Sequence, residues 1–162
     1  MVDAVHEEFH APVPGQDWAE QMRLRSRTAR EALKRHPWAV GMMDSRRTPG
    51  WATLTHHDAA LGCLLEAGFS LGLTGHAFAL LDAHLYGFLL QELALPFDGG
   101  GAELEEVAAG VMASLPEGTL PHFRRFTLEH ALQPGYDFGD EFDVGLELVI
   151  EGLSARLAAE QA

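Results

Sequence analysis

Apolar side chains recur every three or four residues along most of the chain, which is the spacing that one face of an α-helix requires. The clearest example is 18–35, where Trp18, Met22, Ala29 and Leu33 form one stripe. The chain shows no convincing alternation of apolar and polar residues, which is the pattern of a half-buried strand. The sequence therefore predicts an all-α fold with seven or eight helices.

Capping and turn residues set the limits of these helices. Asp17 precedes the run 18–35, and Glu20 follows three residues later, in an approximate capping box. Proline and glycine at 37, 49–50, 68 and 96 separate the later runs. The predicted helices are 2–9, 18–35, 38–45, 51–67, 71–95, 102–115, 121–132 and 141–159.

Two of the predicted helices have unusual patterns. The helix 71–95 is apolar almost all round, which is typical of a helix that is buried on several sides. The short helix 38–45 carries Trp38, Met42 and Met43 between turn residues. Because methionine adapts to irregular neighbours, this segment suits the lining of a binding site as well as the filling of a core.

Composition and charge limit the possible functions. The 162 residues suit one domain, and 47% hydrophobic with 22% charged residues is ordinary for a globular protein. The net charge of −13 disfavours binding to a polyanion such as DNA. The N-terminus lacks a signal-peptide pattern, and the single Cys63 cannot form an internal disulfide, so we expect a cytoplasmic protein.

Three stretches of sequence carry a family resemblance. They are "ALKRHPWAVGMM" (32–43), "LLEAGFSLGLTGHAFALLDAHLYGFLLQE" (64–92) and "FDVGLELVIEGLSARL" (142–157), and "GQDW" (15–18) adds a fourth short match. In this order they resemble the C-terminal regulatory domain of the TetR family of transcriptional repressors. The resemblance extends over nearly the whole chain.

The resemblance implies a domain that binds a small-molecule effector and forms a homodimer. A complete member of the family begins with a helix-turn-helix head that binds DNA. Met1 falls where the helix that joins head to core is already under way, so we expect 1–10 to be a remnant of that helix. The whole of 1–162 is then the ligand-binding and dimerisation domain, and it is not expected to bind DNA alone.

By this resemblance, the ligand pocket lies between the helices 18–35, 38–45, 51–67 and 71–95. A mostly apolar lining with a few fixed polar groups is usual for a small-molecule site. Arg25, His57 and Asp82 are the expected polar groups. An equal alternative is that the methionines fill the core and the polar groups are solvated or paired. The expected lining residues are Arg25, Trp38, Met42, Met43, His57, Leu61, Phe78 and Asp82.

The resemblance also places the dimer face on the last helix, on the helix before it in the bundle (with 121–132 intervening) and on the end of 71–95, as a four-helix bundle of two chains. Gly145 and Gly152 lie inside the last helix, where each costs about 1 kcal/mol relative to alanine. Close approach of another helix is one reason for them, and packing within one chain is the alternative. The expected apolar contacts are Leu85, Leu89, Phe142, Leu146, Val149, Ile150 and Leu153.

The sequence argues against several other chemistries. In the tetracycline repressor a histidine of the short helix helps to bind the drug with magnesium, but that position falls on Met43, so a more apolar effector is expected. The nine histidines include no group with zinc-site spacing, and no metal or other cofactor is expected. Cys63 lies in an apolar run, and the sequence contains no catalytic or nucleotide-binding motif, so an enzyme is not expected.

Two questions stay open at this stage. Eight of the 11 lysines and arginines lie between Arg23 and Arg47, and their role is undefined, although pairing with carboxylates is more common than nucleic-acid binding. The alternative function is a free-standing helical protein that sequesters a hydrophobic compound and regulates nothing.

Overall fold

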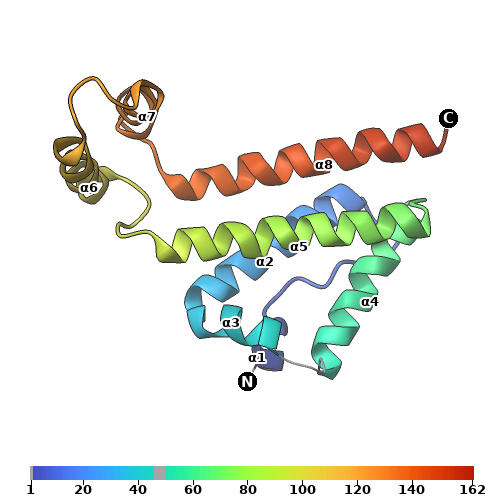
Figure 1. Ribbon diagram of the computed structural model, residues 1–162. Coiled ribbons are helices and arrows are strands. Elements are labelled where there is room, and N and C mark those ends of the chain that lie inside the picture. Colours follow the sequence, from blue (N-terminus) through green and yellow to red (C-terminus); the bar gives the residue numbers. More distant parts are fainter. Residues whose placement is uncertain (1, 46–49) are drawn as a thin grey trace. The chain divides into compact units, whose positions relative to one another are not determined.

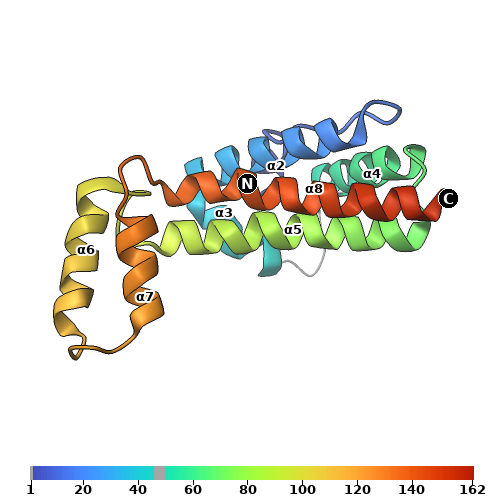
Figure 2. The same ribbon diagram turned by 90° about the horizontal axis from the view of Figure 1, so that it is seen from above.

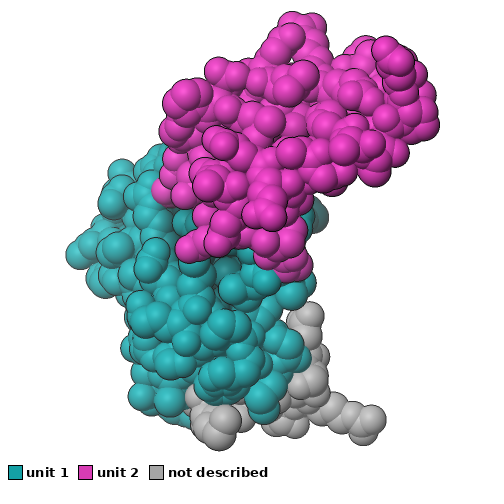
Figure 3. All heavy atoms as spheres, turned by 90° about the vertical axis from the view of Figure 1, so that its left-hand side faces the viewer, with its two compact units in different colours: residues 1–93, 145–162 teal, residues 94–144 magenta. Residues whose placement is uncertain are grey.

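The computed structural model describes residues 2–45 and 50–162 (Figure 1). For residues 2, 3 and 43–45 it describes the backbone and not the side chains. The chain divides into two compact units, which Figure 3 shows in different colours. One unit comprises Met1–Leu93 with Gly145–Ala162, and the other comprises Ala94–Val144.

The first unit contains six of the eight predicted helices, wholly or in large part. They are α1 (Val2–His6), α2 (Trp18–Arg35), α3 (Pro37–Ser45), α4 (Trp51–Glu66), most of α5 (Leu71–Ala94) and most of α8 (Glu141–Glu160). Helix α2 has the predicted limits, because the Asp17 carboxylate accepts a hydrogen bond from the Glu20 amide at 3.0 Å. Gly68 ends the α4 region with a φ of +95°, a left-handed conformation that glycine adopts without strain.

The second unit is a helical pair. Helix α6 (Gly101–Ser114) and helix α7 (Pro121–Phe126) lie side by side in both ribbon views (Figures 1 and 2). The single helix predicted for 121–132 changes after Phe126 into a π-helical turn, Thr127–Ala131, and a 3₁₀ turn covers Phe138–Asp140. The all-α prediction is confirmed, since the described residues hold eight α-helices and no strand beyond one isolated bridge between Gly100 and Asp137.

The basic face of α2 is held by carboxylates on other helices. Arg23 donates two hydrogen bonds of 2.8 Å to Glu147 on α8. Arg30 and Lys34 both bind Glu92 on α5, at 2.6 and 2.7 Å. Burial raises the pKa of Glu92, but the hydrogen bonds from Arg30 and Lys34 outweigh it and leave that pKa below its usual value. The described part of the basic segment therefore fixes α2 against α5 and α8.

Helices α5 and α8 run side by side in opposite directions (Figures 1 and 2). A side chain at Gly145 of α8 would collide with the imidazole of His84 on α5. Close approach within one chain therefore explains Gly145. At Gly152 a Cβ would meet nothing within 4 Å, so its proposed role in pairing two chains stays a prediction.

Gly145→Ala should lower the free energy of unfolding by about 1–3 kcal/mol, because the added methyl group displaces His84 from a packed position. Gly75→Ala is the matched control, since Gly75 also lies in a helix but has open space around it. We expect it to stabilise the chain by up to about 1 kcal/mol. Urea unfolding of both variants measures the difference, and equal effects would remove the packing explanation.

None of the described helices is both long enough and apolar enough to cross a membrane.

Candidate ligand site

Arg25 is the most deeply buried charged group in the described part of the chain. Its side chain lies on the inner face of α2 and is only 3% exposed. Burying an arginine is costly unless its charge and its N–H groups find partners. The groups around Arg25 therefore define the most distinctive polar environment of the first unit.

Two neighbouring helices supply partners for the Arg25 guanidinium. From α5, the Asp82 carboxylate accepts a hydrogen bond from Nη2 at 2.8 Å. From α4, Nε2 of His56 accepts a hydrogen bond from Nε at 3.2 Å. The guanidinium carbon also lies 5.2 Å from the centre of the Phe78 ring, in a cation–π contact. The three helices thus converge on one buried cation.

The third nitrogen of the guanidinium is different. Nη1 of Arg25 is buried and has no hydrogen-bond partner among the described residues. Buried polar groups in native proteins are nearly always hydrogen-bonded, so an orphaned N–H group calls for an explanation.

The two adjacent histidines of α4 both belong to this region. Burial, together with the positive charge of Arg25, lowers the pKa of His56 to about 3. Burial also lowers the pKa of His57, although Asp82 acts in the opposite direction. His57 packs edge-on against Phe78 with ring centres 5.0 Å apart. Both imidazoles are therefore neutral near pH 7.

Helix α1 and the residues after it contact the same cluster from the other side. The Phe9 ring lies edge-on to His56 at 5.6 Å, and His6 lies 6.2 Å from the same imidazole. His6 and Phe9 are each 6% exposed, so this contact is part of the core. His56 therefore lies between Arg25 and the N-terminal segment.

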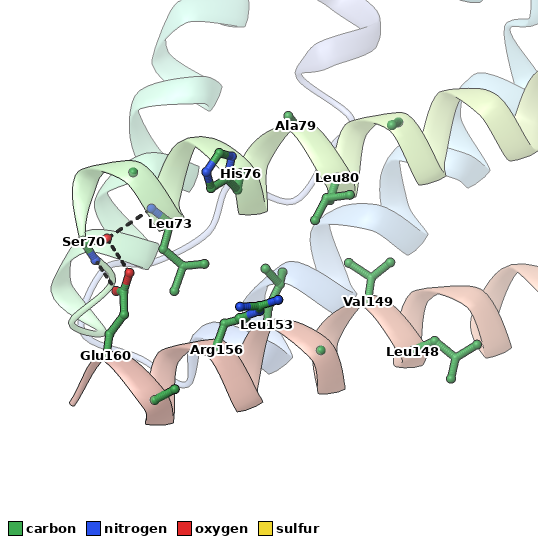
Figure 4. A pocket seen from close by; sticks show the side chains of 14 residues that line it. Ser70, Leu73, His76, Ala79, Leu80, Leu148, Val149, Leu153, Arg156 and Glu160 are labelled. Carbon is green, nitrogen blue, oxygen red and sulfur yellow. Dashed lines mark hydrogen bonds between the residues drawn. The ribbon is translucent and has the colours of Figure 1, made fainter. Parts of the chain in front are cut away.

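A second feature is an open groove between α5 and α8, with a volume of about 1150 Å³. The side chains of Leu80, Val149 and Leu153 lie between the two helices (Figure 4). At one end of the groove, the Glu160 carboxylate accepts hydrogen bonds from the hydroxyl and amide of Ser70, at 2.8 and 3.2 Å. Leu80 and Leu148 remain 51% and 65% exposed, so the lining is largely apolar and uncovered.

The comparisons with known proteins identify the family. A family model described as "Tetracyclin repressor-like, C-terminal domain" matches residues 11–157. A possible TetR family transcriptional regulator from Streptomyces coelicolor A3(2) is 31% identical, with a TM-score of 0.69, over 95% of this chain and 72% of that one. The chain belongs to this family.

Two further solved structures share the tetracyclin repressor-like fold. Both are of ActR from Streptomyces coelicolor, one in complex with actinorhodin and one without ligand, and they are 23% and 22% identical to this domain. Their TM-scores are 0.74 and 0.73, and each match covers 96% of this chain and 73% of ActR. The search of curated proteins gave no match.

The structure of this tetracyclin repressor-like domain brings together half of the predicted ligand residues. Arg25, His57, Phe78 and Asp82 form one connected cluster. Leu61 is half-buried on α4, four residues after His57 and therefore on the same side of the helix.

The predicted residues of the short helix are less well placed by contacts. Trp38 and Met42 lie on α3 and are each 42% exposed, and Trp38 contacts the ring of His36 at 6.1 Å. The side chain of Met43 lies outside the described residues. Their part in a ligand site stays a prediction.

His56 is the functional candidate that the sequence analysis missed. The spacing of apolar residues in 51–67 alone predicts that Leu54, Leu61, Leu64 and Leu65 point inward, yet Leu54 and Leu65 are 46% and 40% exposed. The buried face instead contains His56, Ala60, Cys63 and Leu64, which follow each other at helical spacing. The sequence predicts His56 on the buried face of α4 only if one polar residue is accepted at the helical spacing of Ala60, Cys63 and Leu64.

The predicted dimer contacts need a correction. Phe142, Leu146 and Ile150 are at most 2% exposed within a single chain, and the other predicted leucines are equally internal. A side chain that is already buried cannot offer its surface to a partner. Of the seven, only Val149 is not buried. The buried set is Leu85, Leu89, Phe142, Leu146, Ile150 and Leu153.

The described residues contain no group of three or more histidine, cysteine, aspartate or glutamate side chains that could hold a metal ion.

Acid should destabilise the chain through His56. The unfolded chain binds a proton near the ordinary histidine pKa of about 6.5, whereas the folded chain does so only near 3, so stability falls as the pH decreases through this window. Between pH 7 and pH 5 we expect His56 alone to cost about 2 kcal/mol.

Urea unfolding at both pH values measures this loss in the wild type and in His56→Gln, which keeps an acceptor for Arg25 but cannot titrate. The loss should be about 2 kcal/mol smaller in His56→Gln. His122→Gln removes an exposed histidine instead and should behave like the wild type. An identical pH dependence in all three proteins would contradict the prediction.

Proposed function

We propose that this chain is the ligand-sensing and dimerisation domain of a TetR-family transcriptional repressor, with a small, mostly apolar effector bound at the Arg25 cluster. The observation that carries this proposal is the buried guanidinium with one unpartnered nitrogen beside the ring of Phe78, which in turn packs against His57. Apolar surroundings with a few fixed polar groups suit the recognition of a small molecule.

The cluster has a physical connection to the N-terminal segment. A ligand that moves Arg25 also moves its hydrogen-bond partner His56, which packs against Phe9 and His6. The Glu8 carboxylate in turn binds Arg35 at 2.6 Å and His36 at 2.8 Å, where α2 meets α3. In the proposed function, effector binding changes the position of α1 through these contacts, which is the coupling that an allosteric regulator requires.

We also propose that a second copy of the chain packs on the groove between α5 and α8 and so forms the homodimer. Helix α5 is apolar almost all round, yet its Leu71, Leu80 and Leu90 are 80%, 51% and 56% exposed in the single chain. Exposed apolar patches of this kind commonly mark interaction sites. Because members of this family dimerise, we propose that Leu80, Leu148 and Val149 meet the same residues of a second copy.

The likeness to ActR supports a small-molecule effector, since that protein has been solved with actinorhodin. We propose an effector of the same general kind, a ring-containing compound of low polarity, for this chain. We also propose that this chain binds its ligand without converting it and does not hold DNA by itself. The net charge of −13 and the pairing of Arg23, Arg30 and Lys34 with glutamates support the last point.

A thermal-shift screen of hydrophobic ring compounds tests the proposed site. Compounds that bind should raise the melting temperature of the wild type, because they stabilise the folded state. Phe78→Ala should abolish these shifts, whereas Phe123→Ala, which truncates an exposed phenylalanine of the second unit, should keep them. Hits that Phe78→Ala leaves unchanged would place the ligand elsewhere and overturn the proposal.

A further inference from the structure

The hydrogen bonds of Arg25 suggest which chemical group the effector presents to the site. Arginine carries five N–H donors in a fixed plane and no acceptor. Nε donates to His56, and Nη2 donates to Asp82. Both N–H groups of Nη1 are buried without an acceptor among the described residues. An oxygen acceptor supplied by a ligand would remove this cost of burial.

The charges around Arg25 select between an anionic and a neutral acceptor. The guanidinium and the Asp82 carboxylate form a pair 2.8 Å apart, so their charges balance. His56 and His57 add no positive charge, because burial holds both imidazoles neutral. A ligand carboxylate at Nη1 would leave one unbalanced negative charge in a buried site, which is unfavourable. A neutral oxygen keeps the balance.

The rings beside the guanidinium select the shape of the ligand. Phe78 lies against Arg25, and His57 packs edge-on against Phe78, so a pair of flat rings adjoins the cation. Flat aromatic molecules pack well against such rings in offset or edge-to-face arrangements.

We propose that Nη1 of Arg25 donates a hydrogen bond to a neutral carbonyl oxygen of a planar aromatic effector. This inference rests on the proposed function, since it names the class of ligand for the same site.

Three matched compounds test the inference on the whole chain. 9-Fluorenone carries a neutral carbonyl, fluorene lacks it, and 9-fluorenecarboxylate carries an anion on the same ring system. Equilibrium dialysis gives the three dissociation constants for the wild type. We expect 9-fluorenone to bind about 10- to 100-fold more tightly than fluorene, the range for a hydrogen bond from a charged donor, and also more tightly than the carboxylate.

The variant Arg25→Met/Asp82→Leu removes both members of the charge pair, so that neither charge is left buried alone. It should bind 9-fluorenone and fluorene with equal affinity. Arg27→Met makes the same change at a more exposed arginine of α2 and should keep the wild-type preference. Infrared spectra need no variant: the carbonyl stretch of bound 9-fluorenone should shift below its frequency in an apolar solvent.

Four results would overturn the inference. They are equal binding of 9-fluorenone and fluorene to the wild type, tightest binding of the carboxylate, a carbonyl preference that survives the loss of Arg25, and no binding of any of the three compounds. Equal binding of fluorene and 9-fluorenone would leave the proposed function intact, because an apolar site would then be present without a carbonyl subsite. The proposed function itself would fail in a different measurement, the thermal-shift screen, if ligands raised the melting temperature of Phe78→Ala as much as that of the wild type.

Discussion

Asp82→Ala should lower the free energy of unfolding by about 3 kcal/mol, at the lower end of the range for breaking a buried ion pair. The Arg25 side chain is only 3% exposed and is paired with the Asp82 carboxylate. Without the carboxylate, its remaining hydrogen-bond partner among the described residues is the neutral His56. The reason for the loss is therefore an uncompensated buried charge rather than the removal of a favourable contact.

Asp58→Ala is the matched control for this prediction, because Asp58 is exposed on α4 and the change should stay within about 0.5 kcal/mol. The double variant Arg25→Met/Asp82→Leu should recover much of the loss, since apolar replacements of a buried pair are often neutral. Urea unfolding at pH 7 gives all three values. If Asp82→Ala lowers the free energy of unfolding no more than Asp58→Ala does, the charge of Arg25 is not buried as the structure shows.

The limits of the helices were predictable where local chemistry determines them. Asp17 fixes the start of α2 through its own side chain, and Ser70 accepts a hydrogen bond from the Leu73 amide at the start of α5. The region after Phe126 was not predictable in the same way. Its change to a π-helical turn leaves the periodicity of the sequence almost unaltered, so the pattern cannot distinguish it from α-helix.

The candidate ligand site was partly predictable for a different reason. The family resemblance placed Arg25, His57, Phe78 and Asp82 in the ligand pocket, and the structure joins these four residues in one cluster. Charged residues such as Arg25 and Asp82 usually need a partner when they are buried. His56 was not predicted because the apolar spacing of α4 places its leucines on the inner face, whereas His56 is only 5% exposed.

The residues of the dimer face could not be chosen from periodicity. On α5 and α8, apolar residues occupy both the side that faces the core and the side that faces solvent. Leu85 and Leu80 have the same chemistry, but the first is fully buried in one chain and the second is half exposed. Only the packing of the helices distinguishes residues that stabilise one chain from residues that are left for a second chain.

Leu148→Glu should therefore separate the proposed dimer, with an increase of about 1000-fold in its dissociation constant. Leu148 is 65% exposed on α8, beside the groove that contains Leu80 and Val149. In a twofold dimer each substitution occurs twice. Loss of two buried leucine side chains at about 2 kcal/mol each gives about 4 kcal/mol, and each 1.4 kcal/mol changes the dissociation constant tenfold. The introduced carboxylates add charge where the chain is already acidic.

Sedimentation velocity from nanomolar to micromolar concentration measures this change. Leu24→Glu is the matched control, because Leu24 is 39% exposed on α2, away from the groove residues, and should leave the dimer intact. Circular dichroism should show that both variants keep their helices, since neither leucine belongs to the buried core. A dimer that survives Leu148→Glu would remove the groove from the interface and leave the exposed leucines of α5 without the partner proposed for them.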